Sequence, residues 1–287
     1  MGKIIVIGSG PAGISAALYA VRAGIETIIL TTNSSSLLKA KEIENYYAYE
    51  NPISGEKLVE EGIKQAKRLG VVFYDEEVVG ISFTDQLTLT TKENEYQGDA
   101  VIIATGSTRN TPKIKDLARF EGTGVSYCAV CDGFFYKGKD VGVLGAGDYA
   151  IHEALELLPI AAEVTILTNG VKRNGELPEG IKLDERLISS FQGDDVLKSI
   201  TFEDGSSLEL SGVFIAQGVA GSADLARKLG AETEGSKIIV DSQMATNIPG
   251  LFAAGDCTGG MLQIAKAVYQ GAEAATSAIK LVREMNK

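Results

Sequence analysis

Lys3-Ile-Ile-Val-Ile-Gly8-Ser-Gly10-Pro-Ala-Gly13 opens the 287-residue chain and decides its fold. An apolar run of strand length leads into a Gly-x-Gly-x-x-Gly turn, and the turn leads into an amphipathic helix. Glycines let the backbone approach a pyrophosphate closely, and the positive N-terminus of the helix stabilises its charge. Pro11 suits the first helical turn, where its missing N–H costs nothing. The pattern predicts a dinucleotide site built from Gly8, Gly10, Pro11, Ala12 and Gly13.

The same pattern recurs 137 residues later, with Gly145 in the place of Gly8. Ile14 matches Ile151, and Thr27-Ile-Ile-Leu30 matches Val164-Thr-Ile-Leu167. Each copy is typical of a strand, a glycine turn, a helix and a second strand, which together form the βαβ unit of a Rossmann-type domain. The predicted fold class is therefore α/β, with two Rossmann-like, three-layer dinucleotide-binding domains.

Neither copy ends its second strand in the acidic residue that usually binds a ribose. The first copy has Thr31-Thr32 at that position and the second has Thr168-Asn169. We therefore expect Thr31 and Thr32, or backbone groups beside them, to meet the ribose in the first domain.

The order of the remaining buried strands predicts that the second domain is inserted in the first. Residues 99–106 and 211–218 are apolar strands that end in a glycine turn, one for each copy. A third such strand, 250–256, returns after the second copy. We expect a first domain of residues 1–110 and 220–287, and an inserted domain of residues 111–219. The chain is expected to cross between them at 108–112 and 218–222, which are polar or glycine-rich.

Composition excludes several classes of protein. The formal net charge of −11 argues against nucleic acid or an anionic membrane surface as a partner. The chain shows no apolar run long enough to span a bilayer, and its first strand begins at Lys3, so we expect a cytoplasmic protein without a signal peptide.

Cysteine usage points to redox chemistry. Cys128-Ala-Val-Cys131-Asp132 places two thiols three residues apart beside a carboxylate, a spacing typical of a dithiol that cycles with a disulfide. A zinc site would need Cys257 and His152 as well, and neither has a partner at ligand spacing. We therefore expect no metal site, and we interpret Cys257 as a small buried residue.

Over nearly its whole length the chain resembles the low-molecular-weight thioredoxin reductases. The resemblance is carried by Gly8–Gly13, Glu42-Ile-Glu-Asn45-Tyr, Ala104-Thr-Gly106, Gly124-Val-Ser-Tyr-Cys128-Ala-Val-Cys131-Asp132-Gly-Phe-Phe and Phe252-Ala-Ala-Gly255-Asp256. It implies a homodimeric flavoprotein whose FAD passes electrons to the CxxC pair, which then reduces the disulfide of thioredoxin. It also implies that Cys131 faces the flavin, that Cys128 is its disulfide partner, and that Asp132 moves protons during thiol–disulfide exchange.

The resemblance extends the expected FAD contacts to several further positions. Asp256 could accept a hydrogen bond from a ribityl hydroxyl, or it could cap a helix instead. A helix expected over 261–278 would point its N-terminus at the flavin ring. The family's Gly-Gly-Gln flavin loop reads here as Ser34-Ser-Ser36-Leu37. The further positions expected at the cofactor are Ser36, Asn45, Thr105, Gly106, Gly255, Asp256, Gln263 and Ile264.

The resemblance fails where thioredoxin reductases bind NADPH. They carry a cluster of arginines after the second strand of the inserted domain, because planar bidentate donors suit a 2′-phosphate. This chain has glycines, Lys172, Arg173 and Pro178 there, with no pattern for the usual helix. Tyr149 stands in the second glycine turn, where it would either crowd a pyrophosphate or pack across the turn.

We therefore predict that electrons come from reduced ferredoxin, as in the ferredoxin-dependent flavin thioredoxin reductases, rather than from NADPH. Ferredoxins are acidic, as this chain is, so docking requires a local basic patch. The candidates are Lys137 with Lys139, or Lys39 with Lys41. Three alternatives stay open. They are an NADPH-dependent enzyme with rebuilt contacts, a reductase with another disulfide substrate or a second flavin in the vacated site, and a non-catalytic redox sensor.

Overall fold

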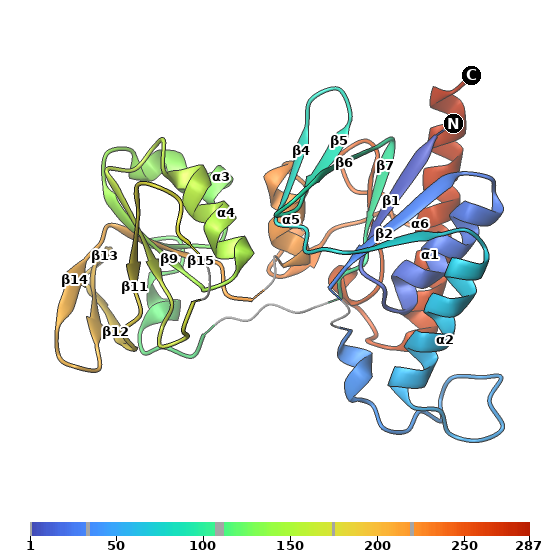
Figure 1. The fold of residues 1–287 in the computed structure, drawn as a ribbon, viewed down its shortest axis with the longest axis horizontal. Helices are drawn as coiled ribbons and strands as arrows, with labels where there is room; N and C mark the ends of the chain where they lie inside the picture. The colour runs from blue at the N-terminus through green and yellow to red at the C-terminus, as the bar shows by residue number, and fades with distance from the viewer. Residues whose placement is uncertain (1, 33–34, 107–111, 174–175, 219–220) are drawn as a thin grey trace. The chain divides into compact units, whose positions relative to one another are not determined.

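The structure, a computed structural model, describes residues 2–32, 35–106, 112–173, 176–218 and 221–287, without the side chains of Ser36 and Lys39. The chain separates into two compact units (Figure 1). The first comprises Met1–Thr108 and Gly221–Lys287, and the second comprises Arg109–Ala220. The crossings expected at 108–112 and 218–222 lie largely outside the described residues.

The first unit is built on a five-stranded parallel sheet with the order β18-β7-β1-β2-β3. Near-continuous apolar runs form its central strands, because a parallel sheet is covered on both faces. Ile5 of β1, for example, is fully buried and pairs with Ile28 of β2 and Val101 of β7. The strands are β1 Lys3–Ile7, β2 Glu26–Thr31, β3 Val72–Asp75, β7 Ala100–Ile103 and β18 Leu251–Ala253.

Three helices cover one face of this sheet, and a three-stranded antiparallel sheet lies on the other (Figure 1). The helices are α1 Pro11–Arg22, α2 Gly55–Arg68 and α6 Ile264–Met285, and the antiparallel strands are β4 Gly80–Phe83, β5 Leu87–Thr90 and β6 Glu95–Gly98. Small residues let α1 and α6 pack closely, since a Cβ on Gly271 would lie 2.1 Å from the Ala12 carbonyl oxygen. The remaining elements of this unit are the 3₁₀ helices η1 Ser36–Lys39 and η4 Asp256–Thr258, helix α5 Ser222–Lys228, and strands β16 Thr233–Glu234 and β17 Lys237–Ile238.

The second unit repeats the plan on a smaller scale. Its parallel sheet has the order β11-β10-β9-β15-β8. These strands are β8 Val125–Ser126, β9 Asp140–Leu144, β10 Glu163–Leu167, β11 Ile181–Asp184 and β15 Gly212–Ile215. An antiparallel sheet of β12 Ile188–Gly193, β13 Leu197–Phe202 and β14 Ser207–Glu209 accompanies it, together with helices α3 Ala129–Asp132 and α4 Asp148–Leu157 and 3₁₀ helices η2 Leu117–Phe120 and η3 Gly133–Tyr136.

The predicted fold class is confirmed, because β1-α1-β2 and β9-α4-β10 are the two copies of the repeated pattern. The prediction for 261–278 needs correction at both ends. The helix begins at Ile264, after an extended Gln263, and continues to Met285. Met261 and Leu262 are more than half exposed, so their apolar side chains did not signal a buried helical face.

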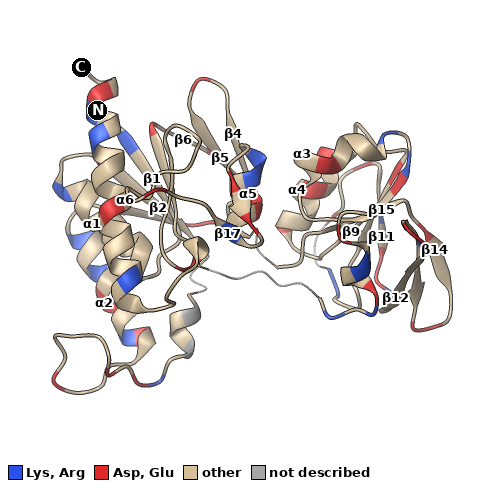
Figure 2. Ribbon diagram, turned by 180° about the vertical axis from the view of Figure 1, so that it is seen from behind, with Lys and Arg blue, Asp and Glu red and all other residues tan. Residues whose placement is uncertain are grey.

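Acidic and basic residues are interspersed over the elements of both units (Figure 2). Among the described residues, no helix combines the length with the apolar character that spanning a bilayer requires.

Candidate functional site: a nucleotide cradle and a redox disulfide

The first glycine turn is shaped to hold an anion at the start of α1. Gly8 has a φ of +104°, and a Cβ on Gly13 would lie 1.9 Å from the Gly8 carbonyl oxygen. These two glycines let the helix pack directly on the turn. Gly10 differs, because the nearest atom to its added Cβ is the Ser35 hydroxyl at 3.7 Å, an ordinary van der Waals contact, so a side chain would meet no clash there. The first turn of α1 carries no acidic residue that would repel a phosphate.

Pro11 is the first residue of α1 and Ala12 is buried beneath it. At the end of β2, Thr31 is buried and its hydroxyl is hydrogen-bonded to that of Ser9 at 2.8 Å. The neighbouring Thr32 is exposed. Of the two threonines expected near the ribose, Thr32 is therefore the one presented to solvent.

Thr105 and Gly106 follow β7 and are partly buried. The Thr105 hydroxyl lies 2.5 Å from that of Ser222, and Ser222 also donates to the Gly106 carbonyl oxygen at 2.7 Å. The strand end is thus tied to the start of α5, and the Thr105 hydroxyl already has a partner within the chain.

The end of β18 meets α1 and α6 through another glycine. Gly255 has a φ of +89°, and its added Cβ would lie 3.0 Å from the Ala12 Cβ. Asp256 begins η4 and is partly buried. Lys266, in the first turn of α6, donates to the Gly255 carbonyl oxygen at 2.8 Å and to that of Gly259. Burial lowers the pKa of Lys266, while the nearby Asp256 carboxylate opposes that change.

A cavity of about 560 Å³ lies where the flavin was expected. Asn45, Gln263 and Ile264, all predicted cofactor residues, are in its wall, and the Asn45 side-chain amide donates to Gln263 Oε1 at 2.8 Å. Ser36 is in η1, but its side chain lies outside the described part. The complete lining is Leu37, Glu42, Ile43, Glu44, Asn45, Leu262, Gln263 and Ile264.

These features fit FAD. An open glycine turn at a helix N-terminus suits the pyrophosphate, and a partly apolar cavity edged by two amides suits a planar ring with a polar edge.

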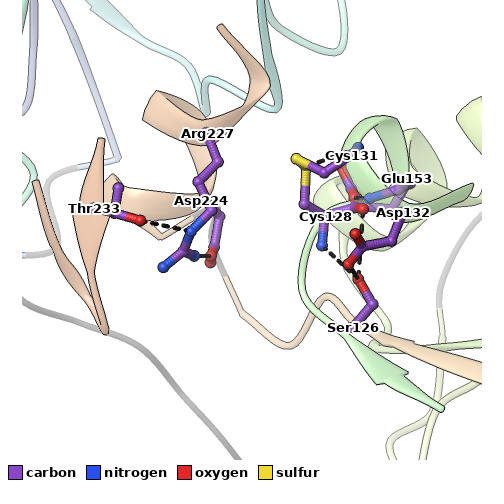
Figure 3. Close-up of a disulfide and its surroundings, with 9 residues drawn as sticks. Ser126, Cys128, Cys131, Asp132, Glu153, Asp224, Arg227 and Thr233 are labelled. Carbon is purple, nitrogen blue, oxygen red and sulfur yellow. Dashed lines mark hydrogen bonds and ion pairs between the residues drawn. A yellow bond between two sulfur atoms is a disulfide. The ribbon is translucent and has the colours of Figure 1, made fainter. Parts of the chain in front are cut away.

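In the second unit, the predicted pairing of Cys128 with Cys131 is present as a disulfide (Figure 3). Cys128 precedes α3 and is 3% exposed, whereas Cys131 is exposed. The backbone N–H of Cys131 donates to Cys128 Sγ at 3.2 Å. The two sulfurs therefore have different access to a partner protein.

Asp132 stands beside the disulfide, held by a residue that the sequence analysis did not single out. The Ser126 hydroxyl donates to Asp132 Oδ2 at 2.6 Å and accepts from the Cys128 N–H at 3.2 Å (Figure 3). Glu153 of α4 was also missed, and its Oε2 accepts from the Ala129 N–H at 2.8 Å. A glutamate on the otherwise apolar inner face of α4 was the available signal for it.

The surface next to the disulfide is apolar. Val130, Phe134 and Phe135 are 52%, 74% and 70% exposed. Behind them, burial raises the pKa of Tyr136, with a smaller contribution from Asp132. Exposed aromatic side chains next to a reactive group are typical of a protein-docking surface.

Cys257 and His152 take no part in this arrangement. Cys257 is 1% exposed in the first unit, and burial raises its pKa to about 12. His152 on α4 lies 3.6 Å from the Glu156 carboxylate. Among the described residues no three potential metal ligands gather.

The second glycine turn keeps the backbone form of the first but not its surroundings. Gly147 caps α4 as Gly10 caps α1, yet Asp148 places a carboxylate in the first turn of α4. Tyr149 is only 2% exposed, so its ring packs inside the unit, which is the second of the two arrangements considered for it. An acidic first turn disfavours a phosphate at this helix N-terminus.

The strand that follows has lost the usual helix, as predicted. Strands β10 and β11 are adjacent and parallel, and the described residues between them form no helix. Cations near this connection bind oxygens of the chain itself. Arg173 donates its backbone N–H to Glu185 at 3.2 Å and its guanidinium to the Glu176 carbonyl at 3.4 Å. Arg186 binds Asp184 through two nitrogens and lowers the pKa of that carboxyl.

Two nucleotide-binding folds, one with a cavity beside its glycine turn's helix layer and one with a Cys-x-x-Cys disulfide, are the architecture of a flavin-dependent disulfide oxidoreductase. Residues 2–271 match the family described as pyridine nucleotide-disulphide oxidoreductase. A thioredoxin reductase of Aquifex aeolicus is 36% identical over 273 residues, which cover 88% of this chain and 84% of that protein.

Two solved structures extend the likeness. The atypical thioredoxin reductase TRi from Desulfovibrio vulgaris Hildenborough is 44% identical, with a TM-score of 0.92 and 99% of each chain covered. A ferredoxin-flavin thioredoxin reductase from Clostridium acetobutylicum is 30% identical, with a TM-score of 0.72, covering 100% of this chain and 99% of that one. The chain belongs to the low-molecular-weight thioredoxin reductases, and it is accordingly an FAD flavoprotein that reduces disulfides.

Proposed function

We propose that this enzyme reduces the disulfide of thioredoxin through Cys128 and Cys131 with electrons from reduced ferredoxin rather than NADPH. One observation carries the choice of donor: the inserted unit keeps a Rossmann sheet but presents no free cationic cluster at its nucleotide edge among the described residues. The 2′-phosphate of NADPH is a dianion that needs such a cluster.

Three details support the loss of that site. The described residues between β10 and β11 form no helix, Arg186 is hydrogen-bonded to Asp184, and Asp148 places a carboxylate in the first turn of α4. The likeness to a ferredoxin-flavin thioredoxin reductase over the whole chain supports ferredoxin as the alternative donor. Lys137 and Lys139 are exposed on the disulfide unit, and Lys41 is exposed on the flavin unit. Lys39 has no described side chain, so the basic patch stays a prediction.

FAD would be held in the first unit by the predicted contacts. The pyrophosphate would lie on Gly8, Gly10, Pro11, Ala12 and Gly13. The ribose and ribityl groups would lie near Thr31, Thr32, Thr105, Gly106, Gly255 and Asp256, and the ring near Ser36, Asn45, Gln263 and Ile264. When bound, the flavin supplies a carrier that takes electrons singly and gives up a pair.

The residues around the disulfide would then manage sulfur and proton chemistry. Reduction of the bridge releases thiolates, and a thiolate is the nucleophile in exchange with another disulfide. Asp132, fixed by the Ser126 hydroxyl, is placed to give and take the proton during these steps. The exposed Phe134 and Phe135 provide an apolar surface on which thioredoxin could dock.

The donor is tested by an anaerobic titration that follows the visible absorbance of the flavin. Reduced ferredoxin should bleach the flavin band within seconds, whereas NADPH and NADH at micromolar concentrations should leave it unchanged over minutes. Rapid bleaching by NADPH would refute the proposal and favour an NADPH-dependent enzyme with rebuilt contacts.

The electron route is tested by replacing Cys131 with Ser. The variant should purify with the same flavin content as the wild type, because the cradle lies in the other unit. Its ferredoxin-driven reduction of thioredoxin should fall by more than about 1000-fold, since the variant can no longer form the Cys128–Cys131 disulfide. Continued turnover would contradict the assigned pair, and negligible turnover by the wild type would favour a redox sensor.

We also propose a homodimer, on the basis of the family resemblance. Light scattering at micromolar concentration should give about twice the chain mass of 30.3 kDa. A monomer at that concentration would remove this part of the proposal.

A further inference from the structure

The turn that joins β18 to α6, residues Gly255–Gly259, is held by two side chains of α6 that the sequence analysis did not single out. Lys266 donates to the Gly255 carbonyl oxygen at 2.8 Å and to that of Gly259. It also contacts the Thr258 hydroxyl at 3.4 Å. Four residues further along the helix, Gln270 Oε1 accepts from the Gly255 N–H at 3.0 Å. Lys266 and Gln270 therefore tie the turn to the helix that follows it.

Lys266 occupies a position at which a cation is usually unfavourable. It is the third residue of α6, and the N-terminus of a helix carries partial positive charge. The first turn of α6 contains no acidic residue that would compensate for a lysine there. A residue that breaks a local rule in this way is often part of a functional site.

The contacts of Lys266 Nζ indicate its protonation state. The two carbonyl oxygens around it, those of Gly255 and Gly259, can only accept hydrogen bonds. The Thr258 hydroxyl directs its single proton to one of two other acceptors, the Gly255 carbonyl oxygen or Gln270 Oε1, each at 2.9 Å. Its oxygen is therefore left to accept from Lys266. Three acceptors around one nitrogen require three N–H donors, and only the ammonium form has three.

This positive charge lies in the part of the unit where FAD is expected. Asp256, the predicted ribityl contact, is inside the turn that Lys266 holds, and its carboxylate attracts the ammonium. Gln263 and Ile264, which line the cavity, come three and two residues before Lys266.

A carboxylate beside a flavin acts against reduction of the flavin. Reduction adds two electrons and one proton, so the ring system gains one negative charge. A second negative charge nearby is repelled unless a cation offsets it. Among the contacts that the structure gives Lys266, the attraction to Asp256 provides such an offset.

We propose that Lys266 is a positioning residue of the flavin site. Its ammonium fixes the Gly255–Gly259 turn against α6 and offsets the Asp256 carboxylate, so that Asp256 can contact the cofactor without opposing its reduction. The inference rests on the proposed function only in placing FAD at Asp256, Gln263 and Ile264. It does not depend on which donor reduces the flavin.

The reduction potential of the bound flavin separates this role from a purely structural one. In Lys266→Met the two-electron equilibrium constant should fall at least about 10-fold, because Asp256 loses its counter-charge; this is a fall of about 30 mV in midpoint potential. The potential is measured anaerobically with xanthine oxidase and a reference dye, so neither ferredoxin nor NADPH takes part. A wild-type potential in flavin-loaded Lys266→Met would overturn the proposal.

Lys266→Arg is the rescue variant, and it also covers the case in which Lys266→Met purifies without flavin. A guanidinium keeps the positive charge and several N–H donors. This variant should retain the wild-type flavin content, and its two-electron equilibrium constant should stay within about twofold, or about 10 mV, of the wild type. A potential as low as that of Lys266→Met, or loss of the flavin, would contradict the role given to the charge.

Two other substitutions on α6 serve as controls. Gln270→Met removes an uncharged contact to the same turn, so FAD should bind less tightly while the potential stays within about 10 mV of the wild type. Lys280→Met removes an exposed lysine from the same helix and should change neither quantity. An equal fall of the potential in Gln270→Met and Lys266→Met would show that the shape of the turn alone sets it, and the proposal would fail.

Asp256→Ala separates this inference from the cofactor placement on which it rests. The dissociation constant of FAD should rise at least about 10-fold in this variant, since the ribityl contact is lost. An unchanged constant would overturn the proposed placement of FAD, and this inference with it. A raised constant in Asp256→Ala, together with a wild-type potential in Lys266→Met, would overturn the role of Lys266 alone.

Discussion

The three cysteines of the chain carry the same side chain in three different surroundings. Cys131 is exposed, Cys128 is nearly buried beside hydrogen-bonded carboxylates, and Cys257 is sealed in the other unit. Burial disfavours a thiolate and exposure permits one, so the surroundings of each cysteine set how readily its sulfur can ionise. Sequence spacing identified the pair, but the difference between its members comes from tertiary contacts.

Cys257 gives a prediction with a defined pH dependence. Burial raises its pKa to about 12, so the folded protein holds it as a neutral thiol at any pH below that value. Reduced protein at pH 8 should therefore label at the exposed Cys131 but not at Cys257 until a denaturant is added. Labelling of Cys257 in the folded protein would contradict the burial that the structure gives it.

Asp132 gives a second prediction at this scale. Asp132→Asn removes the carboxylate but keeps the Ser126 hydroxyl's acceptor, so the fold and flavin content should be unchanged. Thioredoxin turnover should fall by roughly 100-fold or more, as expected for loss of a proton-transfer group. Ser126→Ala removes the hydrogen bond to Asp132 but keeps the carboxylate, so it should lower thioredoxin turnover less than Asp132→Asn does. An equal fall in turnover in the two variants would mean that the position of the Asp132 side chain, rather than proton transfer, limits the reaction.

At the scale of elements, the two glycine turns show that one backbone motif can occur with surroundings that favour or disfavour phosphate binding. Both begin a helix after a buried parallel strand, and both have a glycine cap in extended conformation. The α1 turn is free of acidic residues, whereas Asp148 begins α4. The motif therefore predicts the fold of each βαβ unit, and the charge of the residues in the first helical turn determines whether phosphate binding is favourable.

Alanine substitutions in these turns separate cofactor binding from folding. Gly10→Ala adds a methyl group that clashes with no atom of the chain, so the protein should fold, yet FAD affinity should fall by at least about 10-fold, or 1.4 kcal/mol. Gly13→Ala would press on the Gly8 carbonyl and should lower the free energy of unfolding by about 3 kcal/mol. Flavin content and chemical denaturation measure both effects.

The equivalent substitution in the inserted unit is the matched control. A Cβ on Gly147 would lie 3.6 Å from the Gly218 carbonyl oxygen, so Gly147→Ala should fold, keep its flavin and retain its ferredoxin-driven rate. A loss of donor reactivity in this variant would indicate that the second turn still binds a nucleotide.

For the whole molecule, the sequence supported the fold class, the internal repeat and the disulfide pairing, because each depends on local residue order. It did not reveal the two three-stranded antiparallel sheets, whose strands are short and only partly apolar, as the exposed Phe83 of β4 illustrates. It also missed Ser126 and Glu153, since their importance depends on partners 2 to 24 residues away. Ser126 acts through side-chain contacts that no periodicity marks, whereas the sequence signal for Glu153 was a charged residue on the apolar face of α4.

The central claim is that electrons enter this reductase from ferredoxin and bypass the inserted nucleotide fold. The most direct measurement compares thioredoxin reduction with saturating thioredoxin, driven in turn by reduced ferredoxin and by NADPH, in the same anaerobic preparation. We expect kcat/KM for ferredoxin to exceed that for NADPH by at least about 100-fold, which corresponds to the roughly 3 kcal/mol expected for loss of the charge-assisted phosphate contacts. Equal or greater efficiency with NADPH would contradict it.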